Sequence, residues 1–207
     1  MGHSTGCQDG MHYLVSPKPA HGHDDDDQKK PAIDGLILQA PVSDRDAMPP
    51  SSQETTGLAQ GWVEQGKGGD CLPFSATKEY LGKCPVTANR WLSLASPIPG
   101  AGADDYFSED LPDQKLMSTF GRLPQETPLL ILFGEKDEYV KKGLDAETMI
   151  KRWMRFVQEG GGVVDPDSKR LLEGASHNLN KDPDTVIDGL CTRVLSFLAR
   201  IEQGNVQ

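Results

Sequence analysis

Gly2-His3-Ser4-Thr5-Gly6 is the stretch from which the fold can first be inferred. Its Gly-X-Ser-X-Gly spacing is typical of a nucleophile elbow, a sharp turn between a strand and a helix that exposes a serine hydroxyl. We expect both glycines to let strand and helix approach without a Cβ clash, while Ser4 takes a strained backbone conformation. Glycine and serine are common, so an ordinary exposed serine is the alternative interpretation of this motif.

Two later segments place an acid and a histidine after apolar runs. Pro128–Phe133 predicts a buried parallel strand, and Asp137 lies in the turn that follows it. Lys169–Glu173 predicts another strand, which leads into His177. A parallel sheet carries its ligand-side chemistry at the carboxyl ends of its strands. The chain order Ser4, Asp137, His177 is that of α/β-hydrolases and differs from the order in chymotrypsin and subtilisin.

Each of these candidates has rivals. For the acid, Asp44 follows the preceding predicted strand, and Glu138 is the neighbour of Asp137. The other histidines all precede the region around Asp44, which favours His177 as the base; they are His3, His12, His21 and His23. We expect His3 to be a packing or orienting residue and Cys7 to belong to the core.

The composition excludes several classes of function. A net charge of −10 argues against binding to a nucleic-acid backbone. No run approaches the roughly 18 apolar residues of a membrane span, and no secretory signal is recognisable. Four scattered cysteines without CxxC spacing predict reduced thiols in a cytoplasmic protein. No cofactor is predicted. No metal site is predicted either, since His21–Asp27, with two histidines and four aspartates, is interpreted as a solvated loop.

The pattern along the chain predicts three regions. Residues 1–43 hold the elbow, a helix over about 5–14 and a strand over 33–42. Residues 44–125 show helical patches around 57–65, 77–81 and 88–94 but no parallel-strand pattern, and such a long insertion between core strands predicts a cap or lid. Residues 126–207 form a carboxyl-terminal α/β core, with a helix that follows Asp145 and ends at Gly160 and a final helix over about 186–201.

Aromatic residues of the predicted cap are candidates for a substrate pocket. Trp91, Tyr106 and Phe107 are the residues that we consider for this role. They are also the kind of side chain that forms the cap's own small core, which is the interpretation that we favour. Asp104 and Asp105 fit turn or cap positions better than contacts with a substrate.

The sequence resembles a fungal-type α/β-hydrolase family, long catalogued as a domain of unknown function (DUF1749), that includes siderophore (fusarinine-type) esterases. The resemblance rests on residues 2–9, 38–45, 104–108, 119–121, 137–140 and 174–177. It implies a Ser-His-Asp triad in which Ser4 is the nucleophile, His177 the base and Asp137 the acid. The backbone N–H of Thr5 would be one oxyanion donor. The implied substrate is a carboxylic ester of a small molecule, such as a siderophore-like ester.

Members of that family carry an amino-terminal half before the serine, with further strands and a loop that supplies the second oxyanion donor. We therefore expect a partial α/β-hydrolase fold here: the carboxyl-terminal strands of a mainly parallel sheet, flanking helices and a cap. One alternative is a catalytically inactive hydrolase fragment or a partial gene model. Another is a thioesterase or C–C hydrolase, because the fold does not choose among these reactions. The oligomeric state is not predicted.

Overall fold

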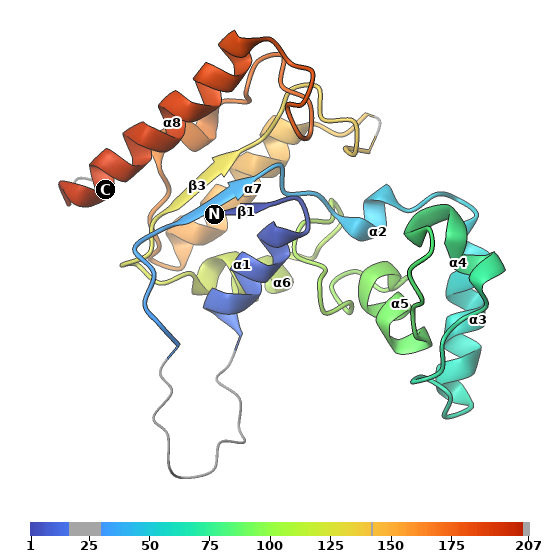
Figure 1. Ribbon diagram of the computed structural model, residues 1–207. Coiled ribbons are helices and arrows are strands. Elements are labelled where there is room, and N and C mark those ends of the chain that lie inside the picture. The colour runs from blue at the N-terminus through green and yellow to red at the C-terminus, as the bar shows by residue number, and fades with distance from the viewer. Residues whose placement is uncertain (17–29, 142, 205–207) are drawn as a thin grey trace. The chain divides into compact units, whose positions relative to one another are not determined.

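The computed structural model describes residues 1–16, 30–141 and 143–204 (Figure 1). The segment His21–Asp27 lies outside the described residues. Contacts within the chain divide it into two units. The sheet unit comprises Met1–Pro41, Asp113–Glu138 and Asp145–Gln207, and the helical unit comprises Val42–Pro112 and Tyr139–Leu144.

The part of the sheet unit that the structure describes contains three parallel strands in the order β1-β2-β3. They are β1 (Gly2–His3), β2 (Leu36–Gln39) and β3 (Leu129–Leu132). All residues of β2 and β3 are buried, as expected of a strand covered on both faces. The predicted strand over 128–133 is confirmed, and the one over 33–42 is confirmed in its central part.

Helices cover both faces of this sheet, which makes the fold α/β. Ile37, Leu130 and Leu132 point to the face where α8 (Asp184–Glu202) packs through Phe197. A second layer comprises α1 (Gly6–Val15), α6 (Asp113–Thr119) and α7 (Ala146–Glu159), which meet around the 3-10 turn η1 (Phe120–Arg122). Figure 1 shows α8 on one side of the strands and α1 and α6 on the other.

Helix α7 forms where its cap and its apolar spacing predict it. The Asp145 side chain accepts a hydrogen bond from the Thr148 backbone N–H at 3.0 Å, which satisfies one of the unpaired donors of the first turn. The apolar positions recur at helical spacing and are buried, and Trp153 stacks on Phe120 with ring centroids 5.3 Å apart. The helix ends before Gly160, as expected.

The expectation of a strand over 169–173 is wrong for most of its length. A 3-10 helix, η2 (Pro166–Lys169), occupies its start. Asp165 caps this turn by accepting the Asp167 N–H, and Pro166 supplies a backbone angle suited to the first helical position. Only Leu172 pairs with the sheet, as a single parallel bridge to Gly134. This bridge still brings the following loop to the carboxyl end of β3.

The helical unit contains four helices among its described residues. They are α2 (Asp44–Ala47), α3 (Ser52–Glu64), α4 (Phe74–Leu81) and α5 (Ala88–Ala95). The predicted helical patches correspond to α3, α4 and α5, although the first patch extends one residue past the end of α3, and α2 has no counterpart among the predictions. Ala59, Leu72, Val86 and Trp91 belong to its core. Across both units, no helix in the described ranges is long and apolar enough to cross a membrane.

Candidate active site

Ser4 lies at the turn between β1 and α1. Its backbone φ is +54°, a left-handed conformation that is strained for a residue other than glycine. Its N–H donates to the Gln39 carbonyl oxygen at 3.1 Å, and its own carbonyl oxygen accepts the Cys7 N–H at 2.9 Å. The elbow is therefore fixed to β2 on one side and to the first turn of α1 on the other.

The two glycines of the motif have different surroundings. A Cβ atom on Gly2 would overlap the Gly6 carbonyl oxygen and lie only 2.8 Å from the Cys7 nitrogen. A Cβ atom on Gly6 would meet nothing within 4 Å among the described residues. The expectation that both glycines avoid a clash therefore holds for Gly2 only. Gly6 contributes its main chain, which passes directly over β1.

Cys7 fills the space behind the elbow. Its side chain is fully buried, with Sγ 3.3 Å from the Gly2 carbonyl oxygen and 3.2 Å from the Gln39 carbonyl oxygen. Burial raises the pKa of the thiol to about 12, so it stays protonated near neutral pH. Cys7 is thus a core residue rather than a nucleophile.

Asp137 and His177 meet after the carboxyl end of β3. His177 Nδ1 lies 3.0 Å and 2.9 Å from the two Asp137 carboxylate oxygens, and both side chains are buried. The Asp137 turn is attached to the histidine loop, since the Lys136 N–H donates to the Ala175 carbonyl oxygen at 2.9 Å. A carboxylate can only accept, so the imidazole presents Nδ1–H to Asp137. Nε2 is then the ring atom that can accept a proton.

Hydrogen bonds hold the backbone of His177 at both its N–H and its carbonyl group. Its N–H donates to Glu138 Oε2 at 3.0 Å. Its carbonyl oxygen accepts from Gln39 Nε2 at 3.2 Å and lies 3.2 Å from His3 Nε2. The His3 and His177 ring centroids are 5.0 Å apart, which agrees with an orienting or packing role for His3.

Two residues link Ser4 to this histidine. Both His3, which precedes it, and Gln39, which binds its N–H, contact the His177 peptide. Within the described part of the chain, no hydrogen bond joins the Ser4 hydroxyl to the His177 ring.

The oxyanion candidate and the rival residues have separate surroundings. Thr5 is the N-cap residue of α1. At this end of a helix the first N–H groups have no acceptor within the helix, and the helix dipole has its positive end. Asp44, the rival acid, accepts a hydrogen bond from the Tyr80 hydroxyl at 3.1 Å within the helical unit. His12 lies 2.9 Å from Ser16 Oγ at the end of α1.

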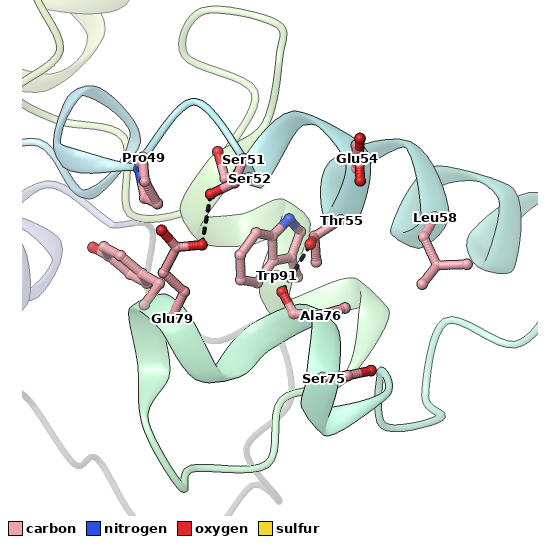
Figure 2. A pocket seen from close by; sticks show the side chains of 11 residues that line it. Pro49, Ser51, Ser52, Glu54, Thr55, Leu58, Ser75, Ala76, Glu79 and Trp91 are labelled. Carbon is pink, nitrogen blue, oxygen red and sulfur yellow. Dashed lines mark hydrogen bonds between the residues drawn. The ribbon is translucent and has the colours of Figure 1, made fainter.

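The aromatic candidates for substrate binding are buried in the helical unit. Trp91 is 1% exposed, and its Nε1 donates to Thr56 Oγ1 at 3.0 Å. It also lines a cavity of about 390 Å³ between α3 and α4, where Ser51 Oγ donates to Glu79 Oε2 at 2.7 Å (Figure 2). Tyr106 and Phe107 are 6% and 2% exposed. For Trp91, the described contacts are those of a core residue.

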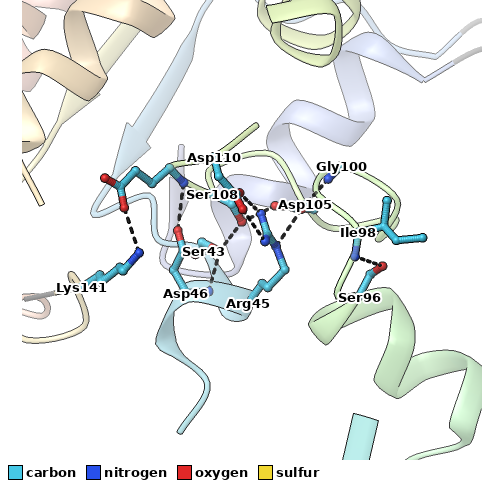
Figure 3. Close-up of polar contacts among 11 residues, drawn as sticks. Ser43, Arg45, Asp46, Ser96, Ile98, Gly100, Asp105, Ser108, Asp110 and Lys141 are labelled. Atoms are coloured by element: carbon cyan, nitrogen blue, oxygen red, sulfur yellow. Dashed lines mark hydrogen bonds and ion pairs between the residues drawn. The ribbon is translucent and has the colours of Figure 1, made fainter. Parts of the chain in front are cut away.

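A polar network in the helical unit accounts for Asp105. Arg45 pairs with buried Asp105 through Nε at 3.1 Å and with Asp110 through its other nitrogens (Figure 3). The Arg45 bond lowers the pKa of the Asp110 carboxyl. Asp105 also accepts the Gly100 N–H at 2.8 Å and the Ser108 hydroxyl. These bonds fasten a long loop to α2, so Asp105 serves the structure of this unit.

Several known proteins are similar to this chain. The fusarinine C esterase of Aspergillus fumigatus is 31% identical over 97% of the chain, and an esterase of Emericella nidulans is 32% identical over 98% of it. The alignments cover 66% and 65% of these relatives, so the chain spans about two thirds of their length.

Solved structures show the same relationship. The siderophore hydrolase EstB from Aspergillus fumigatus superimposes with a TM-score of 0.80 at 33% identity, over 97% of this chain and 66% of that one. A carboxyl esterase from Bacillus coagulans has a TM-score of 0.54 at 16% identity, over 97% of this chain and 63% of that one, which shows a shared fold alone. The family model described as "Protein of unknown function (DUF1749)" matches residues 1–199. The chain therefore belongs to the DUF1749 family.

Proposed function

We propose that this chain carries the active site of a serine hydrolase that cleaves a carboxylic ester of a small molecule, siderophore-like esters being the first candidates. The observation that carries the proposal is the buried contact of Asp137 with His177 Nδ1 at 2.9–3.0 Å, together with a serine at a φ of +54° whose N–H binds Gln39, a residue that also binds His177. The esterase and siderophore-hydrolase names of the relatives support the same reaction class.

In the proposed reaction, Ser4 Oγ attacks the ester carbonyl carbon while His177 Nε2 takes the hydroxyl proton. Asp137 keeps the proton on Nδ1 and stabilises the imidazolium that forms. Collapse of the tetrahedral intermediate breaks the ester C–O bond, and Nε2 returns the proton to the departing alkoxide. Water then attacks the acyl-Ser4 ester while His177 Nε2 takes its proton. Collapse breaks the bond between the acyl carbon and Ser4 Oγ, Nε2 returns the proton to Oγ, and the carboxylic acid is released.

Charge develops on the carbonyl oxygen in both steps. The Thr5 N–H, at the start of α1, is the donor that we assign to this oxygen, because it follows the nucleophile and lies at the positive end of the helix dipole. One such donor contributes about 2.7–4 kcal/mol to the stability of the transition state.

We further propose that the helical unit acts as a cap. The chain enters this unit at residue 42, just beyond the carboxyl end of β2, and again at residue 139, directly after Asp137 and Glu138. Insertions at the carboxyl ends of parallel strands lie at the edge of the sheet where ligands bind. Such a cap would select substrates and exclude water.

Labelling with a fluorophosphonate tests the nucleophile directly. The wild-type chain should become labelled, whereas Ser4→Ala should not. His177→Gln should react more slowly by orders of magnitude. Ser118→Ala is a matched control, because Ser118 is an exposed helix residue whose hydroxyl donates to the local Lys115 carbonyl oxygen. Absence of labelling in folded wild-type protein, or equal labelling of Ser4→Ala, would refute the proposal.

Paired substrates distinguish the ester reaction from the thioesterase and C–C hydrolase alternatives. An ester and a thioester with the same acyl group should differ in kcat/KM in favour of the ester. A preference for the thioester, or turnover of a β-diketone alone, would assign the site to one of the alternatives while leaving Ser4 as the nucleophile.

A further inference from the structure

Gln39 is a buried polar residue at the end of an otherwise apolar strand. It follows Leu36-Ile37-Leu38 in β2 and is 5% exposed. Burying an amide is unfavourable unless its polar atoms form hydrogen bonds. Its Nε2 donates to the His177 carbonyl oxygen at 3.2 Å, across 138 positions of sequence. The side chain therefore has a specific partner, and that partner is the proposed base.

The main chain of the same residue holds the proposed nucleophile. The Gln39 carbonyl oxygen accepts the Ser4 N–H at 3.1 Å. One residue thus contacts Ser4 through its backbone and His177 through its side chain. A substitution of the Gln39 side chain removes the second contact and leaves the first in place, because the backbone carbonyl is retained.

Glu138 binds the backbone N–H of the same histidine. Its Oε2 accepts the His177 N–H at 3.0 Å, while the neighbouring Asp137 binds the ring. Other amides of this loop are held in the same way: the Gly174 N–H donates to Glu135 Oε2 at 2.8 Å and the Ser176 N–H to Asp182 Oδ2 at 2.7 Å. Among these carboxylates, Glu138 is the one that binds the amide of His177 itself.

We propose that Gln39 and Glu138 are positioning residues that fix the His177 peptide from its two ends, so that the imidazole stays aligned between Ser4 and Asp137. This inference rests on the proposed function. It goes beyond the triad because neither residue belongs to it, and each acts through the His177 backbone. Displacement of a reacting group by about 1 Å can lower the rate by about 100-fold, so such contacts matter for catalysis.

Three variants and one control test the proposal in the full chain. Gln39→Met keeps the length of the side chain and removes the donor. Glu138→Ala removes the acceptor, and Glu138→Gln restores a neutral one. Glu135→Ala is the matched control, because Glu135 is also exposed and binds an amide of the same loop, three positions before His177.

Kinetics distinguish positioning from a general loss of structure. With an ester substrate, Gln39→Met and Glu138→Ala should lower kcat by about 10- to 100-fold and leave KM within about threefold. Glu138→Gln should recover most of the loss, and Glu135→Ala should stay within about twofold of wild type. Equal losses in Glu135→Ala and Glu138→Ala, or no loss in either proposed residue, would overturn the inference.

An exchange measurement makes the inference independent of activity. Hydrogen exchange of the His177 amide at neutral pH should be at least about fivefold faster in Glu138→Ala than in wild type, as expected for one lost hydrogen bond. Gln39→Met should accelerate it as well, while Glu135→Ala should not. If wild type neither reacts with the fluorophosphonate nor cleaves esters, the proposed function fails, but this measurement still tests whether Gln39 and Glu138 hold the His177 backbone. Unchanged exchange in folded Glu138→Ala would refute it.

Discussion

Gly2 and Gly6 are packed so closely that a Cβ atom on Gly2 would lie 2.6 Å from the Gly6 carbonyl carbon. The reverse is not true, since a Cβ atom on Gly6 would find open space in the described structure. The close approach of β1 and α1 therefore requires a residue without a Cβ atom at position 2, whereas at position 6 it depends on the path of the main chain.

This asymmetry predicts different outcomes for two alanine variants. Gly2→Ala should lower the free energy of unfolding by about 1–3 kcal/mol, the usual range for overpacking, and should displace Ser4. Gly6→Ala should change it by no more than about 0.5 kcal/mol. Denaturant unfolding followed by tryptophan fluorescence measures both values. Equal destabilisation by the two variants would contradict the packing described here.

The contact of Asp137 with His177 predicts a strong effect of a small substitution. Asp137→Asn should lower kcat by about 10⁴-fold, because an amide can donate to Nδ1 and so favours the wrong tautomer. Asp44→Asn should stay within about twofold of wild type, since the new amide keeps an oxygen that accepts from the Tyr80 hydroxyl. Kinetics with one ester substrate compare the two. A larger loss in the Asp44 variant would reassign the acid.

Cysteine labelling should separate Cys7 from the other thiols. Cys71, Cys84 and Cys191 are exposed, whereas Cys7 is buried with its pKa raised to about 12. At pH 8, iodoacetamide should modify the three exposed cysteines in native protein and reach Cys7 only after unfolding. Peptide mass spectrometry identifies each site. Rapid modification of Cys7 in native protein would show that the space behind the elbow opens to solvent.

Asp165 and Arg200 form an ion pair that should matter for stability. The Asp165 carboxylate is fully buried and accepts from Arg200 Nε at 2.7 Å and Nη2 at 2.8 Å. Asp165→Ala should lower the free energy of unfolding by about 1–3 kcal/mol, because it removes two charge-assisted hydrogen bonds and the acceptor that caps η2, while Arg200 keeps its bond to Asp167 Oδ2 at 2.6 Å. Lys151→Ala, which breaks the exposed pair with Glu147, should cost less than about 1 kcal/mol. Similar losses in both would contradict this ranking.

The histidine loop should also respond to acid. The hydrogen bond from the His177 N–H lowers the pKa of Glu138 below its usual value of 4.5, with a smaller opposing effect from Asp182. Because the folded-state pKa is depressed, the stabilisation is present above the usual pKa and disappears as pH falls through the folded-state value. As pH falls below 4.5 and through the lowered folded-state pKa of Glu138, the His177 amide should therefore lose protection in wild type but not in Glu138→Gln. Parallel pH profiles would refute this assignment.

Much of the fold and the candidate triad is visible in the sequence because it depends on local patterns. The apolar run of β3 and the helical spacing of α7 with its Asp145 cap are local features, and both elements form where they are expected. The strand over 169–173 was predicted on the same kind of evidence. There, the Asp165-Pro166 cap and the buried pair with Arg200 favour a 3-10 turn instead. The strand propensity of residues 169–173 is thus overridden by the contact of Asp165 with Arg200, which the sequence pattern does not indicate.

The contacts that hold the candidate base are not visible in the sequence. Gln39 has no motif of its own, and its partner His177 is distant in the chain. A signal was nevertheless present, since an amide that ends a fully apolar strand must find a partner inside the protein. The burial of Trp91 also needed the structure, because an aromatic residue in an insertion is compatible with a pocket as well as with the small core that we favour.

The helical unit is assembled from two separate stretches, since residues 139–144 return to it after the chain has completed β3. Lys141 in the second stretch pairs with Glu109 in the first at 3.0 Å (Figure 3). A chimera that takes only residues 42–112 from a relative would therefore combine the relative's first stretch with this chain's second stretch, and the contacts between the two would no longer match. Exchange of this region between family members therefore requires both stretches to be replaced together. Where a hybrid protein fails to fold, residues 139–144 are the first segment to compare between the parents.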